Sequence, residues 1–512
     1  MKLKARQVAF TIVVVLVVAP ILFAWFWQAK DKAAVLKYKE QLQAAGEKLT
    51  IAEILSRPPA RESNSAAAAA MVFRMSRSRS GTSLLTTNEP RAMHMIVPGK
   101  AVIGWAQPAV MRDRFTNSWQ EELEALSKEA LPPEWIDQII AHPVLDFQLD
   151  YQVGFELLLP HLAPLKYTAT LLSMGVVGDL HRAETDAAVR KTRAILATAQ
   201  ALREEQLIIS QLVRFAITHI GMTATWELLQ SSKVTDEQLA ALQNDWSRLD
   251  FPSPYKQALL MERAIEERTF DRLRSSSREF RRLATGGGPV TSPSGNLFEQ
   301  AGNLVLLKGK ETAWNYAWSY PDELRSLKGL QVLLETIQQV SDGRPYFEAL
   351  AEQEQRLGKL GIVARKDDDP SLFDMGQWDI RKLMSQSVLG LQRGITRVEA
   401  TEVARALTVT AIALRRYRLR HGQFPGDLSA LTPQFLRTIP RDPIDGKDLR
   451  YRPNADGTFL LYSIGADGVD NGGDPTTTIE TKNYTWQKGR DWIWPQPATA
   501  DELKAYYKSE RK

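Results

Sequence analysis

The stretch "GITRVEATEVARALTVTAIALRRYRLRHGQFP", residues 394–425, decides the fold, because the pattern of the chain changes here. Val403, Leu407, Ala411 and Leu414 recur at helical spacing, which places their apolar side chains on one face. A glycine and a proline follow the last apolar position, and both residue types end helices. The sequence therefore predicts one long helix that ends near residue 422.

A β-hairpin is predicted in the next segment, "IPRDPIDGKDLRYRPNADGTFLLYSIG", residues 439–465. Leu449–Pro453 and Thr458–Ile464 alternate or run apolar, as strands do. Asp456 and Gly457 lie between them, and an Asp-Gly pair is a strong signal for a hairpin turn. The helix and the hairpin together predict a compact α+β module.

The chain before this module has a mainly helical pattern, from about residue 119 to residue 392. Residues 187–221 form a long amphipathic run, which we expect to be one helix ending at Gly221. Thr235 and Gln238 have the spacing of a capping box, which predicts the start of another helix. We therefore expect a mainly α protein with a helical central domain and a small α+β module at its C-terminus.

Composition excludes several classes of site. The chain has 512 residues, 44% of them hydrophobic, and no cysteine. The absence of cysteine rules out thiol nucleophiles and iron–sulfur clusters. The net charge of +5 is small and spread along the chain, which gives no support for nucleic-acid binding.

A membrane anchor is predicted near the N-terminus. Residues 8–27, "VAFTIVVVLVVAPILFAWFW", carry no charge and have about the length that crosses a bilayer as a helix. Basic residues at positions 2, 4 and 6 favour a cytoplasmic N-terminus. A cleaved signal peptide is the alternative, but its apolar region is usually shorter and no A-x-A site follows. We expect a single-pass protein of the inner (cytoplasmic) membrane whose bulk is periplasmic or otherwise extracytoplasmic.

Catalytic motifs are absent from the sequence. None of the six histidines forms H-E-x-x-H, and no G-x-S-x-G elbow occurs. Carboxylates are scattered over the predicted helices, and spacing in sequence does not reveal which of them meet in the fold. An envelope hydrolase with its active site in the helical domain therefore stays open as an alternative.

An acidic loop, "YSIGADGVDNGGDP", follows the second predicted strand at residues 462–475. Calcium binds six to eight oxygen atoms, and aspartate, asparagine and backbone carbonyls supply such ligands. Glycine permits the left-handed backbone that wrapping around an ion requires. The alternative is a loop stabilised only by Asx-turns.

The module resembles the major pseudopilin of type II secretion systems. The resemblance covers about residues 395–494 and rests on the order of five short motifs: Tyr417, "HGQFP" (421–425), "PRDP" (440–443), "LRY" (449–451) and "YSIGADG" (462–468). It implies a long helix packed on a small antiparallel sheet and a calcium site in the loop after the last tyrosine-bearing strand.

The resemblance also implies a ligand set for calcium. Asp467 stands at the first acidic ligand, Asp474 stands at the second, and Ile464 and Val469 stand where the family offers backbone carbonyls. Pro475 replaces a further acid of the family. Two other aspartates are candidates to complete the site, and these are Asp470 and Asp491.

The N-terminus departs from the pseudopilin pattern. In "VAFTIVV", residues 8–14, Ala9 replaces the glycine of the peptidase site and Val14 replaces the glutamate that sets subunit register. The layout as a whole resembles large membrane-anchored bacterial envelope proteins that end in such a module. Assembly into a filament is therefore not part of our expectation.

The expected organisation has five parts. These are an anchor (1–29), a juxtamembrane helix and linker (30–118), a helical domain (119–393), the pseudopilin-like module (394–497) and a charged tail (498–512). The expected function is that of a non-enzymatic envelope protein, structural or partner-binding, with a module stabilised by calcium. Its expected partners are the membrane, through residues 8–27, and proteins of the cell envelope.

Overall fold

The computed structural model describes residues 26–55, 92–111, 116–141, 143, 145–284, 297–363, 380–477 and 485–510. Nearly all of the expected anchor at 8–27 lies outside these ranges. In the part of the chain that the structure describes, no helix is both long and apolar enough to span a bilayer.

The chain is mainly helical, as predicted, with small sheets that involve the C-terminal segment. Helix 26–44 comes first and ends before Gly46, which has a positive φ. The other helices described before residue 360 are α2 (Ile51–Ile54), η1 (Gly104–Ala106), α4 (Trp119–Glu129), α5 (Pro133–Ala141), η2 (Tyr151–Glu156), α6 (Leu162–His181), α7 (Thr185–Ala201), α8 (Ile208–Gln230), α9 (Asp236–Ser247), α10 (Pro252–Ser275), α11 (Ser277–Ala284), α12 (Leu297–Ala313), the π-helix η3 (Trp314–Trp318), α13 (Ser319–Ser341) and α14 (Tyr346–Lys359).

The C-terminal module contains the predicted helix and hairpin. Its elements are α15 (Ser387–His421), the 3-10 turn η5 (Leu428–Leu431), β5 (Arg450–Pro453), β6 (Phe459–Ser463) and β7 (Trp492–Ile493), followed by β8 (Gln496–Pro497) and α16 (Ala500–Glu510). Strands β5, β6 and β7 form an antiparallel sheet in that order. Gly422 ends α15 in the left-handed conformation, as the sequence predicts.

The prediction of a single helix at 187–221 was wrong. The chain turns at residues 202–207, and α8 then continues through Gly221 to Gln230. The side-chain amide of Gln211 holds this turn, since it donates hydrogen bonds to the carbonyls of Leu202 and Glu205 at 3.0 and 2.7 Å. Gly221 serves close helix packing, because a Cβ atom there would lie 2.8 Å from the Leu196 side chain on α7.

A second small sheet joins distant parts of the chain. β1 (His94–Val97) pairs antiparallel with β2 (Lys100–Val102), and β2 pairs parallel with β8. A further antiparallel pair is formed by β3 (Val110–Met111) and β4 (Thr116–Asn117). The predicted linker at 30–118 therefore contains strands, one of which pairs with residues 496 and 497, the last two residues of the expected module.

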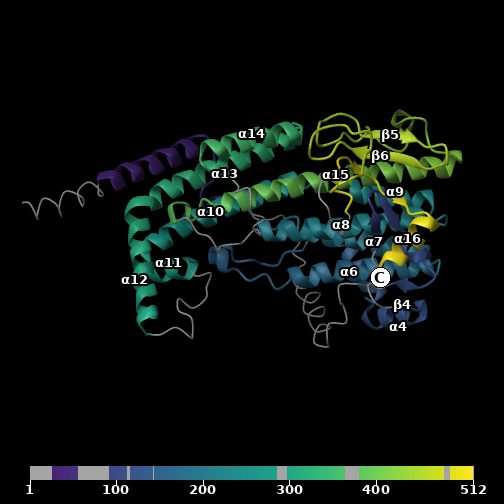
Figure 1. Ribbon diagram of the computed structural model, residues 1–512, viewed down its shortest axis with the longest axis horizontal. Coiled ribbons are helices and arrows are strands. Elements are labelled where there is room, and N and C mark those ends of the chain that lie inside the picture. Colours follow the sequence, from purple (N-terminus) through teal and green to yellow (C-terminus); the bar gives the residue numbers. More distant parts are fainter. Residues whose placement is uncertain are drawn as a thin grey trace, which may run out of the picture.

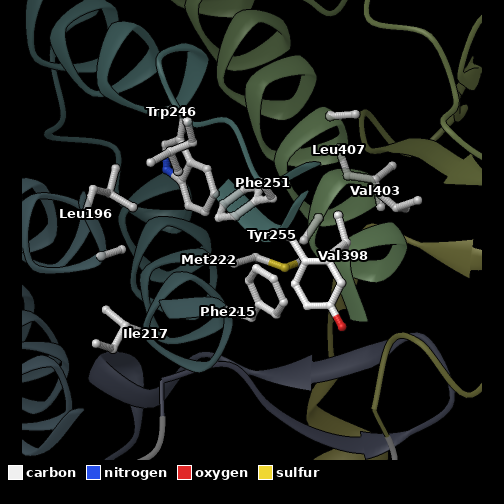
Figure 2. Packing of buried hydrophobic residues seen from close by; sticks show 14 of the residues in the cluster. Leu196, Phe215, Ile217, Met222, Trp246, Phe251, Tyr255, Val398, Val403 and Leu407 are labelled. Carbon is white, nitrogen blue, oxygen red and sulfur yellow. The ribbon is translucent and has the colours of Figure 1, made fainter. Parts of the chain in front are cut away.

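One hydrophobic cluster unites the helical body and the module. It extends from Ile51 to Trp494 and includes residues of α6 to α10, α13, α15 and β6. Figure 2 shows Phe215, Met222 and Tyr255 packed together in this cluster, with Val398 of α15 beside them. Helix α15 also crosses residue 394, the expected start of the module. Because they share α15 and one core, the body and the module are packed as one unit.

The molecule is elongated (Figure 1). Helix α12 runs across one end, close to helix 26–44, and strands β5 and β6 lie at the other end. Helices α10, α13 and α15 extend along the molecule between these ends.

Candidate functional site

The acidic loop begins where β6 ends and returns to β7. Gly465 has φ +72°, and a Cβ atom there would lie 2.0 Å from the carbonyl oxygen of Arg490. Only glycine therefore fits this close crossing of the two backbone segments. The crossing brings Asp491 next to the loop residues 471–474.

Asp491 is fully buried and organises the loop. Its carboxylate accepts hydrogen bonds from the backbone N–H groups of Asn471, Gly473 and Asp474, at 3.3, 2.7 and 2.9 Å. Burial raises the pKa of Asp491, and these hydrogen bonds act in the opposite direction. Asp491 therefore fixes the path of the loop backbone in this structure.

Asp470 is held by polar groups of the sheet. It accepts hydrogen bonds from the Tyr462 hydroxyl at 2.9 Å and from the Gly472 N–H at 3.0 Å. The Arg450 Nε atom lies 3.3 Å from its carboxylate. Although partial burial opposes the shift, these three contacts hold the pKa of Asp470 below its ordinary value. Asp470 is therefore ionised and charge-compensated at neutral pH.

Asp467 and Asp474 each stabilise a local turn. Asp467 accepts from the Val469 N–H at 3.0 Å. Asp474 accepts from the N–H and hydroxyl of Thr476 at 3.0 and 2.9 Å, and these bonds lower the pKa of Asp474. Asp467 is exposed and Asp474 half-buried, so both can be reached from solvent.

The two residues expected to offer backbone carbonyls to calcium, Ile464 and Val469, differ in solvent exposure. Ile464 is buried, and its N–H donates to Asp442 at 3.0 Å. Val469 is exposed, and its carbonyl oxygen accepts from the Asn471 side chain at 2.9 Å. All these groups offer oxygen, which is the donor that calcium prefers. Within the described residues, however, no three carboxylate or histidine side chains converge as a metal-ligating group.

Taken by donor type alone, the oxygen atoms of the loop suit calcium. Asp467, Asp474 and the carbonyls of Ile464 and Val469 would hold the ion, with Asp470 or Asp491 completing the set. Asp467 and Asp474 would first have to exchange their Asx-turn hydrogen bonds for the cation. When bound, calcium would supply positive charge among aspartates that otherwise repel one another.

Asp442 links the end of β6, where the acidic loop begins, to the segment before β5. It is fully buried and accepts hydrogen bonds from the Ser463 hydroxyl at 2.7 Å and from the Ile464 and Ile444 N–H groups at 3.0 Å each. The Asp442 carboxylate also forms an ion pair with the Arg450 guanidinium, at 2.9 Å. Asp442 belongs to the "PRDP" motif, but the sequence did not show that it anchors the loop.

Helix α14 of the body rests on the same region. The N–H groups of Tyr346 and Phe347 donate to the carbonyls of Pro443 and Ile444, at 3.0 and 3.1 Å. The Phe347 ring lies over Gly468 in the acidic loop, where a Cβ atom would come within 2.5 Å of the ring. The acidic loop is therefore in direct contact with the first turn of α14.

Several glutamates are buried inside the helical body. Glu227 on α8 accepts hydrogen bonds from the N–H groups of Met93 and Gly104, at 2.8 and 3.0 Å, and burial raises its pKa to about 7. Burial also raises the pKa of Glu399 on α15, to about 8. Glu266 on α10 accepts a hydrogen bond from the Ser326 hydroxyl at 2.7 Å.

A cleft of about 1160 Å³ opens elsewhere, between α9, α15 and the loop at 432–441. None of these three buried glutamates lines it. Five arginines do, together with a single carboxylate, that of Asp448. The arrangement expected of a hydrolase, several carboxylates converging in one pocket, is not what this cleft presents.

Comparison of the chain with protein-family models, with curated proteins and with solved structures finds no match. The resemblance to pseudopilins therefore rests on the motifs of the module alone.

Proposed function

We propose that the chain is a non-enzymatic, membrane-anchored protein of the bacterial envelope, whose helical body carries a pseudopilin-like module away from the membrane and presents it to partner proteins. The apolar run at 8–27 and the basic residues before it support the anchor and its orientation.

The observation that carries the proposal is an apolar surface at one end of the molecule. Leu304, Val305 and Leu306 on α12 are 43%, 71% and 66% exposed. Phe26 and Trp27, where the described chain begins, are also exposed. A group of large exposed apolar side chains is costly in water and indicates contact with an apolar partner.

A bilayer surface suits this end of the molecule. Gln28, directly after the apolar run, donates a hydrogen bond to the Asn315 carbonyl at 3.0 Å, which ties helix 26–44 to the π-helix following α12. Lys308, which is paired with Glu311 at 2.7 Å, and Lys310 follow the exposed apolar residues of α12. Basic residues beside an apolar surface favour anionic headgroups. The apolar end would then face the membrane, and the module would lie at the far end (Figure 1).

Calcium belongs to the same proposal as a stabiliser of the distal module. The oxygen-rich loop, the glycines that shape it and the likeness to the pseudopilin motifs support this. Because the loop contacts α14 through Phe347, ordering of the loop would also favour one fixed position of the module on the body.

Single cysteines can test this orientation, since the chain has none of its own. In the full chain reconstituted in vesicles, a polarity-sensitive dye at Leu306→Cys should be quenched by lipids that carry a quencher. The same dye at Val469→Cys, an exposed position of the acidic loop, serves as the control and should not be quenched. Equal quenching at the two positions would refute the proposed orientation.

The same variants test the topology in cells. A maleimide that cannot cross membranes should label Val469→Cys when added to intact spheroplasts. Labelling only after lysis would place the module in the cytoplasm and would contradict the proposal.

A further inference from the structure

The arginine-lined cleft lies where the helical body meets the module. Its walls are the C-terminal half of α9 with the following residue Arg248, the face of α15 between Arg405 and Arg416, and the loop at 432–441. At about 1160 Å³ it is larger than most small-molecule pockets, and it opens to solvent between two parts of the fold. An extended ligand would fit it better than a compact one.

The walls are held in place by hydrogen bonds. The Gln243 side chain donates to the Phe435 carbonyl at 2.8 Å and accepts from Arg416 at 2.9 Å, so α9, the loop and α15 are joined at one residue. The guanidinium groups of Arg416 and Arg420 each lie 5.4 Å from the centre of the Phe435 ring. The cleft is therefore built before any ligand arrives, which reduces the entropy lost on binding.

Positive charge in the cleft exceeds what the protein neutralises. Arg405 is paired with Glu402 at 2.6 Å, and Arg416 is paired with Asp236 at 2.7 Å. The remaining three, Arg248, Arg437 and Arg441, are exposed and form no ion pair with a carboxylate in the described part of the chain. Guanidinium groups bind carboxylates through paired hydrogen bonds, so these three arginines offer sites for several anionic groups.

Apolar side chains line the cleft together with these arginines. Val409 of α15 and Leu436, Ile439 and Pro440 of the loop line the same cleft. A simple inorganic polyanion has nothing to pack against them. A polypeptide whose acidic side chains alternate with aliphatic ones would use both kinds of surface.

We infer that this cleft binds an acidic segment of a partner protein, in which Asp or Glu alternates with aliphatic residues. The inference goes beyond the proposed tether and does not depend on the membrane or on calcium. It gives the partner-binding role a location at the distal end of the molecule, on the side of the module where α9 and α15 meet.

Fluorescence anisotropy with the full chain in detergent tests this inference. The binding probe is a labelled pool of short peptides in which Asp and Glu alternate with Leu, Ile and Val. Two matched pools replace either the acidic residues by Asn and Gln or the aliphatic residues by Ser. We expect saturable binding of the first pool, weakened at least about tenfold in either matched pool and reduced by added salt.

Charge reversal locates the site. Arg248→Glu, Arg437→Glu and Arg441→Glu should each weaken binding about tenfold, because each removes one guanidinium and adds a repelling carboxylate. These side chains are exposed, so the fold should persist, and unchanged thermal melting would verify it. Arg452→Glu is the matched control, since this exposed arginine on β5 lies outside the cleft.

Three results would overturn the inference. One is the absence of saturable binding by the acidic, aliphatic pool. Another is unchanged binding in the variant that reverses all three arginines. The third is that the pool with serine in place of the aliphatic residues binds as tightly as the acidic, aliphatic pool, and that tripolyphosphate displaces both completely. The cleft would then bind anions by charge alone.

Discussion

Tyr255 of α10 lies directly over Gly394 of α15. The tyrosine hydroxyl donates a hydrogen bond to the Leu391 carbonyl at 2.8 Å, and a Cβ atom at residue 394 would lie 1.9 Å from the hydroxyl oxygen. Both residues are buried in the cluster that unites body and module. The absence of a side chain at residue 394 is therefore what allows α15 to approach α10 so closely.

Gly394→Ala should destabilise the protein by about 1–3 kcal/mol, because the added methyl group forces Tyr255 or α15 to move. Denaturant unfolding of the full chain in detergent measures the change. Gly309→Ala is the matched control, since Gly309 is also helical but has no neighbouring atom within 4 Å of an added Cβ. The control should be neutral or stabilising by up to about 1 kcal/mol. Equal effects of the two substitutions would mean that the contact with Tyr255 is not constraining.

Calcium should raise the melting temperature of the full chain relative to chelator. An ion that binds only the folded protein stabilises it by about 2.7 kcal/mol at a hundredfold excess over Kd. Asp467→Ala should remove most of this gain, and Asp470→Ala will show whether that residue replaces the acid lost at Pro475. Asp456→Ala is the control, because Asp456 makes the same kind of turn with Thr458 outside the acidic loop. Identical melting temperatures in calcium and in chelator would show that the loop does not bind calcium and is stabilised only by its Asx-turns.

The contact between α14 and the acidic loop should make the effects of substitutions at Gly468 and Phe347 on the free energy of unfolding non-additive. Gly468→Ala introduces a clash with Phe347 in addition to the strain of φ +69°, so its cost should fall by about 0.5–3 kcal/mol in a Phe347→Ala background. Gly472→Ala is the matched control for Gly468→Ala. Gly472 has a similar φ of +73°, but no atom lies within 4 Å of a Cβ added there. The cost of that control should not depend on residue 347. Additive effects of Gly468→Ala and Phe347→Ala would argue against the contact.

Ionisation of the buried Glu227 carboxyl group should make the folded protein less stable as pH rises. Burial raises the pKa of Glu227 in the folded protein from an ordinary value of 4.5 to about 7, so the folded state holds a proton that the unfolded state has lost. This contribution is present below about pH 4.5 and is lost progressively up to about pH 7, by on the order of 3 kcal/mol. Its Oε2 atom has no hydrogen-bond partner in the described structure and can carry that proton.

Glu227→Gln should remove this pH dependence, because the amide resembles the protonated acid in shape and charge. The variant should be more stable than the parent protein at pH 8 and similar to it near pH 4.5, as measured by denaturant unfolding. Other buried glutamates contribute in the same direction, so the informative quantity is the difference between variant and parent. Glu354→Gln, at an exposed position on α14, should leave the profile unchanged. A profile for Glu227→Gln that matches the parent would contradict the assignment.

Features set by neighbouring residues could be predicted from the sequence alone. The end of α15 at Gly422, the hairpin turn at Gly457 and the capping box of Thr235 with Gln238 all occur as expected. Each depends on contacts within a few residues, so local propensity and hydrogen bonding are sufficient to decide it. The oxygen-rich character of the acidic loop was visible for the same reason, since its donors lie within one short segment.

Features that depend on distant contacts were decided by tertiary structure. Gly221 stays inside α8 because α7 packs against it, although the sequence predicted an end there. The pairing of β2 with β8 joins residues almost four hundred positions apart, at Lys100 and Gln496. The convergence of Arg248 with Arg437 and Arg441 arises in the same way, because only packing of α9 against the module brings them to one cleft. The positions of these three arginines in the sequence do not predict the cleft. The packing that brings them together is stabilised by burial of apolar side chains elsewhere in the shared core.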